Sequence, residues 1–295
     1  MDGIGAYQER DFSASRNPTI DILELGRKKH HIPVLLEIDI TESRKRLREI
    51  KTARGRGISF TAWVMACIGQ AASEHKRVHA LRKGRKRLVV FDDVDISVLV
   101  ERVDNRQAGQ TETLPMPYVV RKANEKSVQA IHTEIRAAQA APVTKGEVQI
   151  DSTRQAFATR LFARLPRFLR NLIVWRPLLN NPLRTKKTMG TVVVTSIGNI
   201  GKSNDSSSGW AIPTGIHALV VAVGSIARKP GVIGDAIEIR EYLSMTVLFD
   251  HDVVDGAPVA RFVQRLKELL ETCYGLDEAF ESATPALMEV KELFR

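Results

Sequence analysis

A histidine and two carboxylates lie close together in the last third of the sequence, in the order Asp250-His251-x-x-x-Asp255-Gly256. The residues before this motif have the composition of a strand, and the apolar spacing after it predicts a helix. A histidine at a strand end has a rigid backbone, and an imidazole, with an ordinary pKa of about 6.5, can transfer protons at neutral pH. His251 is therefore a candidate general base, and Asp255 a candidate for orienting the loop or balancing a cation. The alternative is structural, because an aspartate before a glycine is also a common helix cap.

The rest of the chain alternates between patterns typical of strands and of helices. Thr41, Ser59 and Asn124 are the expected N-caps of three helices. The periodicity predicts strands at 32–40, 94–100, 115–120, 190–197, 216–223 and 238–249, and helices at 42–53, 60–75, 125–141, 257–272 and 276–293. This order favours a mixed α/β fold built as a single domain over residues 1–295, with an N-terminal arm over residues 1–15.

The composition is ordinary for a soluble globular protein, with 43% hydrophobic and 26% charged residues. Cys67 and Cys273 form no Cys-x-x-Cys pair, so we expect neither a disulfide framework nor a metal site. The first residues lack a signal-peptide pattern and no apolar run is long enough for a membrane span, so we expect a cytoplasmic protein. The net charge of +10 suits an anionic partner or a solvated basic surface, and with 6% aromatic residues we expect no nucleic-acid binding.

Five segments in order give the sequence a family resemblance. Leu248 to Ala257, continued by Ala260 to Phe262, resembles the catalytic signature of the dihydrolipoyl acyltransferase cores of 2-oxoacid dehydrogenase complexes. The other matching segments are Ile32–Val34, Pro117–Ser127, Gly190–Gly198, and Leu219–Gly224 with Lys229-Pro230. The resemblance covers about residues 15–272 and implies the two-layer α/β sandwich of the related chloramphenicol acetyltransferase.

The resemblance also implies a mechanism and an assembly. The chain would form a homotrimer with the active site between subunits and acyl-coenzyme A as a substrate. His251 would take the proton from an attacking thiol, hydroxyl or amine. Thr195 of a neighbouring subunit, with Ser196 next to it, would donate a hydroxyl to the tetrahedral oxyanion, which contributes about 3 kcal/mol. Asp255 would be structural and pair with an arginine near the N-terminus, for which Arg16 is the nearest candidate.

Three features depart from the family. We see no lipoyl domain and no Asp-Lys-Ala lipoylation site, so we expect a stand-alone core whose lipoyl or acyl-carrier donor is a separate protein. Asp252 stands where the family has an arginine, which reverses a charge beside His251. Asn124 replaces an acidic residue.

The largest departure is the basic segment over residues 155–188, which holds eight Arg or Lys and no acidic residue. One helical face would carry its apolar residues, although Pro166 weakens a continuous helix. These apolar residues are Leu161, Leu165, Phe168, Leu169 and Leu172, with Arg160, Arg164, Arg167 and Arg170 largely elsewhere. Such a stretch is typical of contact with anionic membrane, through residues 155–185, or with an acidic carrier protein, or of packing within the trimer.

Two smaller patterns are interpreted structurally. Lys83 to Arg87 is a run of basic residues that suits a solvated hairpin tip or a phosphate site, and His217 lies in an apolar strand, as a core histidine does.

Three functions therefore stay open. The first is an acyltransferase that moves an acyl group between coenzyme A or a carrier and an unidentified acceptor. The second is a dihydrolipoyl acyltransferase core served by a separate lipoyl protein. The third is a non-enzymatic assembly or membrane-associated protein that has kept the fold.

Overall fold

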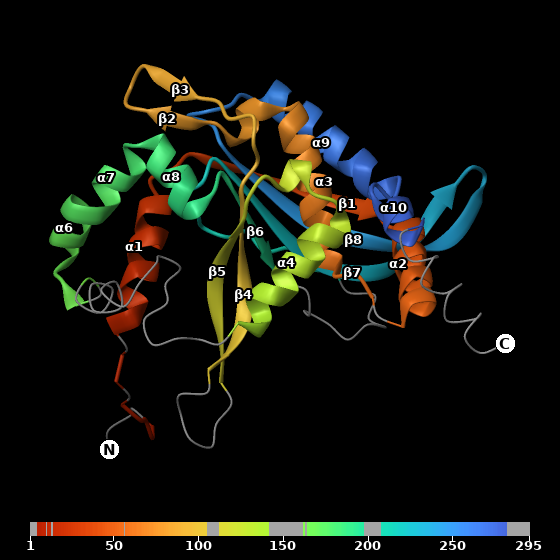
Figure 1. The fold of residues 1–295 in the computed structure, drawn as a ribbon, viewed down its shortest axis with the longest axis horizontal. Coiled ribbons are helices and arrows are strands. Elements are labelled where there is room, and N and C mark those ends of the chain that lie inside the picture. The colour runs from red at the N-terminus through yellow and green to blue at the C-terminus, as the bar shows by residue number, and fades with distance from the viewer. Residues whose placement is uncertain are drawn as a thin grey trace.

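A six-stranded mixed sheet forms the centre of the molecule (Figure 1). The computed structural model describes residues 5–9, 11–12, 14–55, 57–104, 112–141, 162, 164–197 and 208–281. The strand order is β1-β8-β7-β6-β4-β5, and a separate two-stranded ribbon pairs β2 with β3. The strand β6 is parallel to both its neighbours, while the other pairs are antiparallel.

The strands are β1 (His31–Asp39), β2 (Leu81–Lys83), β3 (Arg87–Val89), β4 (Ile96–Asp104), β5 (Glu112–Val120), β6 (Val192–Ser196), β7 (Leu219–Ile233) and β8 (Ala236–Asp250). The helices are α1 (Asn17–Gly26), α2 (Thr41–Arg54), α3 (Phe60–Glu74), α4 (Val128–Ala140), α6 (Arg167–Arg170), α7 (Arg176–Leu179), α8 (Pro182–Met189), α9 (Gly256–Glu271) and α10 (Leu276–Glu281). Short 3-10 turns occupy Ala14–Arg16 (η1), Lys76–His79 (η2) and Ala123–Glu125 (η3), and a π-helical turn, η4, occupies Asn171–Trp175. The mixed α/β architecture predicted from the sequence is confirmed, and the part of the predicted 276–293 helix beyond 281 lies outside the described residues.

The hydrophobic core lies between one face of the sheet and the helices α2, α3, α4 and α9 (Figure 1). Every second residue of a strand points to this face, so Met245, Val247 and Phe249 of β8 are buried in it. The helix α3 supplies Trp63, whose side chain is fully buried and whose indole N–H donates to the carbonyl of Tyr274 at 3.1 Å. The alternation fixes which face of the sheet each strand residue occupies, including those of the candidate site.

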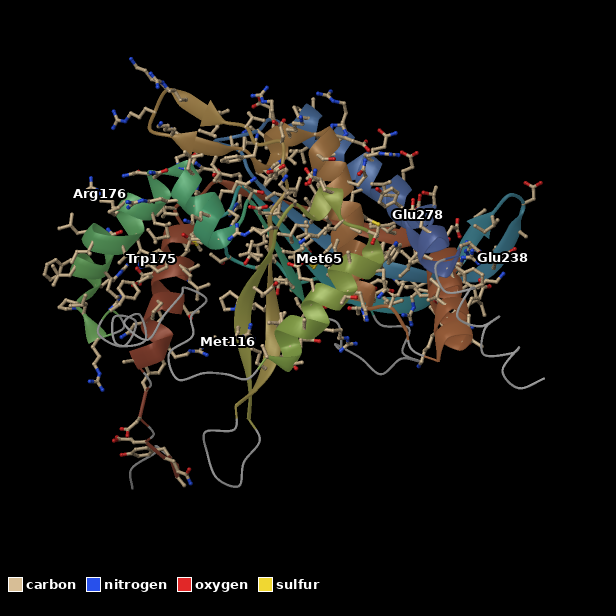
Figure 2. The ribbon with its side chains drawn as sticks, viewed as in Figure 1. Met65, Met116, Trp175, Arg176, Glu238 and Glu278 are labelled. Atoms are coloured by element: carbon tan, nitrogen blue, oxygen red, sulfur yellow. The ribbon has the colours of Figure 1, made fainter. Side chains whose placement is uncertain are left out.

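The helices α1, α6, α7 and α8 lie together at one end of the sheet, away from the main helical layer (Figure 1). Asp21 of α1 is 3% exposed and accepts hydrogen bonds from Arg170 at 2.6 and 2.8 Å and from the indole N–H of Trp175 at 3.0 Å. Burial alone would raise the pKa of Asp21, but the hydrogen bonds from Arg170 and Trp175 hold that pKa below its usual value. Trp175 packs inward, while the neighbouring Arg176 is exposed (Figure 2).

The described part of the basic segment 155–188 does not form a continuous helix, which agrees with the weakening expected at Pro166. The helical conformation is interrupted at Pro166, and separate short helices and the turn η4 follow. Arg170, expected largely off the apolar face, is buried against Asp21, whereas Phe168 and Leu172 of that face are 69% and 56% exposed. Residues 155–161 lie outside the described residues. No described helix is long and apolar enough to cross a membrane.

Helix caps were predicted in part correctly. The helix after η3 begins at Val128, and Ser127 is its N-cap, with its Oγ accepting from the backbone N–H of Ala130 at 3.2 Å. Asn124 is therefore not the cap; its side-chain oxygen accepts from the backbone N–H of Val94 at 2.8 Å and joins η3 to the entrance of β4. Ser59 does occupy the N-cap position of α3, without a side-chain hydrogen bond to that helix.

Two hairpins project from the body of the molecule. The ribbon β2–β3 carries the Lys83–Arg87 run at its turn, and all five of those residues are exposed, as expected of a solvated tip. Gly84 has φ +64°, a left-handed conformation that suits glycine in this tight turn. The long hairpin β7–β8 ends in exposed apolar residues, among them Val232 at 74% and Ile237 at 77% exposure.

Candidate active site

His251 lies directly after the last residue of β8, where hydrogen bonds hold the backbone on both sides. Its backbone N–H donates to the carbonyl of His30 at 3.0 Å, and the N–H groups of Val253 and Val254 donate to the carbonyl of Asp250 at 2.9 and 3.2 Å. The Asp250 side chain is fully buried, and its carboxylate accepts a hydrogen bond from Nζ of Lys29 at 2.8 Å. The imidazole itself is exposed. The sequence thus builds a turn with a hydrogen-bonded backbone and an imidazole that an incoming proton donor can reach.

Asp252, which reverses the family's charge beside His251, contacts two basic side chains. One oxygen lies 3.0 Å from Nδ1 of His30 and the other 3.3 Å from Nη1 of Arg82. The hydrogen bond with His30, together with the charges of His30 and Arg82, holds the pKa of Asp252 below its usual value. The carboxylate therefore joins the segment before β1, the ribbon β2–β3 and the turn of His251.

Thr195 and Ser196 end β6, and the sheet register places them far from His251 of the same chain. Val192 of β6 pairs with Leu219 of β7, and Leu219 pairs with Phe249 of β8. On β6, Thr195 lies three positions beyond Val192. His251 lies two positions beyond Phe249 in the opposite direction. Five positions correspond to about 16 Å along the strands, and the two strand spacings add about 10 Å across the sheet. One chain therefore does not bring Thr195 and His251 into one site.

The alternation of β6 distinguishes the two hydroxyls. Val192 and Val194 belong to the helix-covered core, so Thr195 lies on the opposite face of the sheet, where it is half-buried. Ser196 is exposed at the end of the strand. The glycine-rich turn after it, from Gly198, lies outside the described residues.

Asp255 is the N-cap residue of α9, and it is exposed. Its side chain accepts no hydrogen bond from that helix, and no ion pair links it to Arg16 or to another residue in the described part of the chain. The buried carboxylate at this turn is instead Asp250, and its cation is Lys29. The motif Asp250-His251 was visible in the sequence, but nothing local marked Lys29 as the partner.

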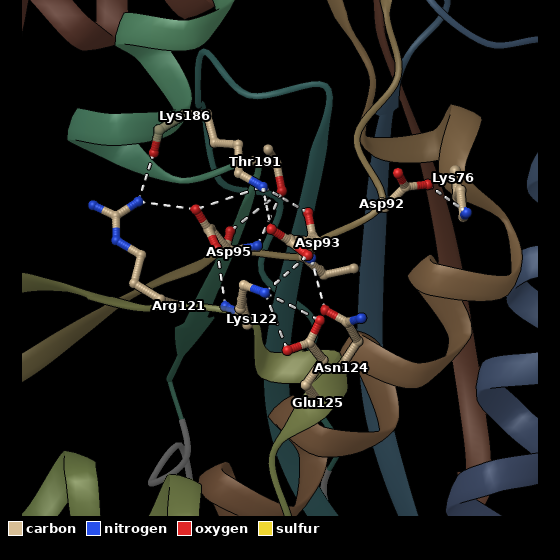
Figure 3. A network of polar contacts seen from close by, with 11 residues as sticks. Lys76, Asp92, Asp93, Asp95, Arg121, Lys122, Asn124, Glu125, Lys186 and Thr191 are labelled. Carbon is tan, nitrogen blue, oxygen red and sulfur yellow. Dashed lines mark hydrogen bonds and ion pairs between the residues drawn. The ribbon is translucent and has the colours of Figure 1, made fainter.

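A polar network at the same end of the sheet fixes the start of β6 (Figure 3). Asp95, just before β4, is 4% exposed and accepts from Nη1 of Arg121 at 2.9 Å and from the backbone N–H of Lys122 at 2.9 Å. The backbone N–H of Thr191 donates to the carbonyl of Asp95 at 2.8 Å, and Arg121 also donates to the carbonyl of Lys186 at 2.7 Å. The network ties α8, β4 and β6 together and thereby positions the strand that ends in Thr195.

Histidines gather at this end of the sheet. His217 is 4% exposed and its Nε2 lies 3.0 Å from the carbonyl of Met189, which confirms the expected core histidine; Nε2 of His31 in turn lies 2.8 Å from the carbonyl of His217. His79 is fully buried, and neither ring nitrogen has a hydrogen-bond partner within the described residues. Burial lowers the pKa of both His79 and His217 to about 4, so both are neutral at pH 7. In the described ranges, no group of three or more His, Cys, Asp or Glu is placed to hold a metal ion.

Comparison with known proteins places this arrangement in context. Residues 180–276, which include Thr195, His251 and Asp255, match the family model "2-oxoacid dehydrogenases acyltransferase (catalytic domain)". The lipoamide acyltransferase component of the Bacillus subtilis branched-chain alpha-keto acid dehydrogenase complex is 24% identical over 256 residues, which are 84% of this chain and 49% of that protein. The acetyltransferase component of the Corynebacterium glutamicum pyruvate dehydrogenase complex is 35% identical over 98 residues, 32% of this chain and 14% of that protein. The chain thus spans at most about half the length of these two relatives.

Solved structures show the fold. A probable dihydrolipoamide acetyltransferase from Listeria monocytogenes superposes with a TM-score of 0.62 at 19% identity, over 91% of this chain and 96% of that one. The Azotobacter vinelandii dihydrolipoamide acetyltransferase gives 0.63 at 18% identity, over 93% and 96%. Residues 180–276 are therefore similar to the catalytic domain of the 2-oxoacid dehydrogenase acyltransferases, and the chain has the fold of dihydrolipoamide acetyltransferase cores.

Proposed function

We propose that this protein is an acyltransferase that moves an acyl group between coenzyme A, or an acyl carrier, and a thiol, hydroxyl or amine acceptor. The observation that carries the proposal is the turn at His251, which lies inside the segment that matches the acyltransferase model. Hydrogen bonds hold the backbone of this turn, and its imidazole is exposed. The B. subtilis and C. glutamicum relatives are named as acyltransferase components of 2-oxoacid dehydrogenase complexes, which supports acyl transfer here.

The reaction is a direct transfer without an acyl-enzyme. The imidazole of His251 takes the proton of the acceptor as its sulfur, oxygen or nitrogen forms a bond to the acyl carbonyl carbon. The carbonyl oxygen becomes an oxyanion, and the Thr195 hydroxyl of a neighbouring subunit donates a hydrogen bond to it. When the intermediate collapses, the bond to the leaving thiol breaks and His251 returns the proton to it.

We propose a homotrimer with the site between subunits, and the positions of the same residues support a site shared between copies. A hydroxyl about 16 Å along and about 10 Å across the sheet cannot reach an oxyanion at His251 within one chain, so a second copy must supply it. In the A. vinelandii enzyme a serine, a histidine and an asparagine four positions after the histidine have been investigated for their catalytic role. Thr195, His251 and Asp255 follow the same order with the same last spacing. Asp255 would act by positioning, with Ser196 as the alternative hydroxyl.

We propose acyl-coenzyme A as a substrate and the cytoplasm as the cell compartment. Both cysteines are free thiols, and Cys67 is buried, which suits a reducing environment. A second candidate function, a dihydrolipoyl acyltransferase core served by a separate lipoyl protein, is favoured by the names of the relatives. The two differ in acceptor, since only the second acylates dihydrolipoamide efficiently.

The test follows release of free coenzyme A from acetyl- and longer acyl-coenzyme A with a panel of acceptors that includes dihydrolipoamide. We expect turnover that His251→Ala removes, while thermal unfolding shows an intact fold because the imidazole is exposed. Thr195→Ala should lower kcat by about two to three orders of magnitude, and the matched Ser196→Ala should leave it near wild type. An active His251→Ala variant would refute the general base; turnover that survives Thr195→Ala and falls with Ser196→Ala would assign the oxyanion to the other hydroxyl. Silence across the panel with no acyl-coenzyme A binding would favour the non-enzymatic assembly or membrane-associated function.

A further inference from the structure

The tip of the β2–β3 ribbon concentrates positive charge that nothing else in the described structure neutralises. Five of the six residues from Arg82 to Arg87 are cations, and no carboxylate occurs between His75 and Phe91. Arg82 pairs with Asp252. The other four have no ion pair within the described residues, and all are exposed; these basic-tip residues are Lys83, Arg85, Lys86 and Arg87. Like charges at this spacing repel one another, so an anionic partner would relieve an unfavourable electrostatic term.

The ribbon is mechanically joined to the His251 turn. Arg82 at the base of the ribbon holds Asp252 at 3.3 Å, and Asp252 holds His30, whose carbonyl accepts from the backbone N–H of His251. Ala80, directly before β2, packs with Val253 in a small apolar cluster. Whatever binds the tip is therefore held beside the candidate base.

The shape of the tip favours a macromolecule over a small anion. Small ligands bind in concave sites with a few buried polar groups, whereas these side chains stand on a convex turn. A Cβ built at Gly84 would meet nothing within 4 Å, so no other segment packs over the turn. Leu88 and Val90 add apolar surface on one flank, at 39% and 48% exposure. Exposed charge with a small apolar flank is typical of a protein interface that steers a partner of opposite charge.

We infer that the basic tip is the docking site of an acidic carrier protein that exchanges an acyl group with coenzyme A at His251. This inference rests on the proposed acyl transfer at His251 and specifies how the donor is delivered. The partner is recognised by its negative surface, while the transferred group enters the site separately. Docking at the tip therefore raises the encounter rate with the carrier without touching the reacting atoms.

The experiment compares the full chain with the basic-tip variant, Lys83→Glu/Arg85→Glu/Lys86→Glu/Arg87→Glu. A matched control reverses four exposed cations elsewhere: Lys45→Glu, Lys51→Glu, Arg136→Glu and Arg228→Glu. The probes are a purified, strongly acidic lipoyl domain loaded with an acetyl group, and free acetyl-dihydrolipoamide, with coenzyme A as acceptor. At low ionic strength we expect kcat/KM for the lipoyl domain to fall about 100-fold in the basic-tip variant and little in the control, and the salt dependence to disappear. The kcat/KM for free acetyl-dihydrolipoamide should stay unchanged.

Three outcomes would overturn the inference. An equal loss in the two variants would assign the effect to net charge alone. A higher KM for coenzyme A in the basic-tip variant, with the carrier unaffected, would assign the tip to the phosphates of the small substrate. Loss of binding to phosphatidylserine vesicles, with the carrier kinetics intact, would assign it to a membrane. Calorimetry with the unloaded lipoyl domain tests docking separately from the reaction. A chain that binds the domain through the tip but transfers no acyl group would refute the proposed reaction and not the docking.

Discussion

Mixing two inactive variants tests whether each site is built from two chains. In wild type, His251 and Thr195 of one chain lie five strand positions and two strands apart, a separation far beyond hydrogen-bond reach. If each site in a trimer takes its histidine from one chain and its hydroxyl from the next, a His251→Ala chain still supplies Thr195, and a Thr195→Ala chain still supplies His251. In a random assembly of equal amounts, about half of the sites have an intact histidine and about half have an intact hydroxyl. Both groups are therefore present together in about a quarter of the sites.

The assay unfolds the two variants together, refolds them and follows coenzyme A release. We expect about a quarter of wild-type turnover from the mixture, against about 0.1 to 1% from Thr195→Ala alone and less from His251→Ala alone. The control mixes the His251→Ala/Thr195→Ala double variant with either single variant; no site then holds both groups, so turnover should stay at the level of the single variant or below. A mixture no more active than the average of its parents, although mass spectrometry shows mixed oligomers, would refute the shared site and the use of the sheet register to derive it.

Two further predictions concern stability. Because the pKa values of His79 and His217 are lowered to about 4 in the folded state, the unfolded chain binds more protons between about pH 6.5 and pH 4, and stability falls as the pH falls through that window. Each histidine accounts for about 3 kcal/mol, so the free energy of urea unfolding should fall steeply from pH 7 to pH 4, and His79→Gln should reduce that loss. A flat pH profile would contradict the burial of these rings. Asp21→Asn should cost about 3 kcal/mol of unfolding free energy, since it leaves the buried guanidinium of Arg170 without a counter-charge. Asp277→Asn removes a 73% exposed carboxylate that pairs with Arg46 and should change the denaturation midpoint little; equal effects of the two substitutions would contradict the buried pair.

Local patterns predicted the elements that carry the site. The apolar alternation before Asp250 and the 3.6-residue periodicity after Gly256 are properties of consecutive residues, so β8, the turn of His251 and α9 were found from sequence. The resemblance directed attention to Thr195 in the same way, because its motif lies in one short strand. Such signals identify candidate residues without stating how far apart the fold places them.

Long-range partners escaped the sequence reasoning. Asn124 looked like a helix cap, but it bonds to Val94, thirty positions earlier, and Ser127 caps the helix instead. Arg170 looked solvent-facing until α1 supplied Asp21. The separation of His251 from Thr195 depends on strand order and register, which no local pattern encodes.

The strand β6 is only five residues long, and it runs from the Asp95 network at its start to Thr195 near its end. Because side chains alternate between faces, inserting or deleting one residue between Thr191 and Thr195 would turn the hydroxyl to the helix-covered face and move it by about 3.3 Å. An internal strand between two parallel neighbours cannot absorb such a change by sliding, since its start is fixed by hydrogen bonds to β4. The number of residues in β6, independently of their identity, is thus a constraint on catalysis, and this segment should tolerate substitutions far better than changes of length.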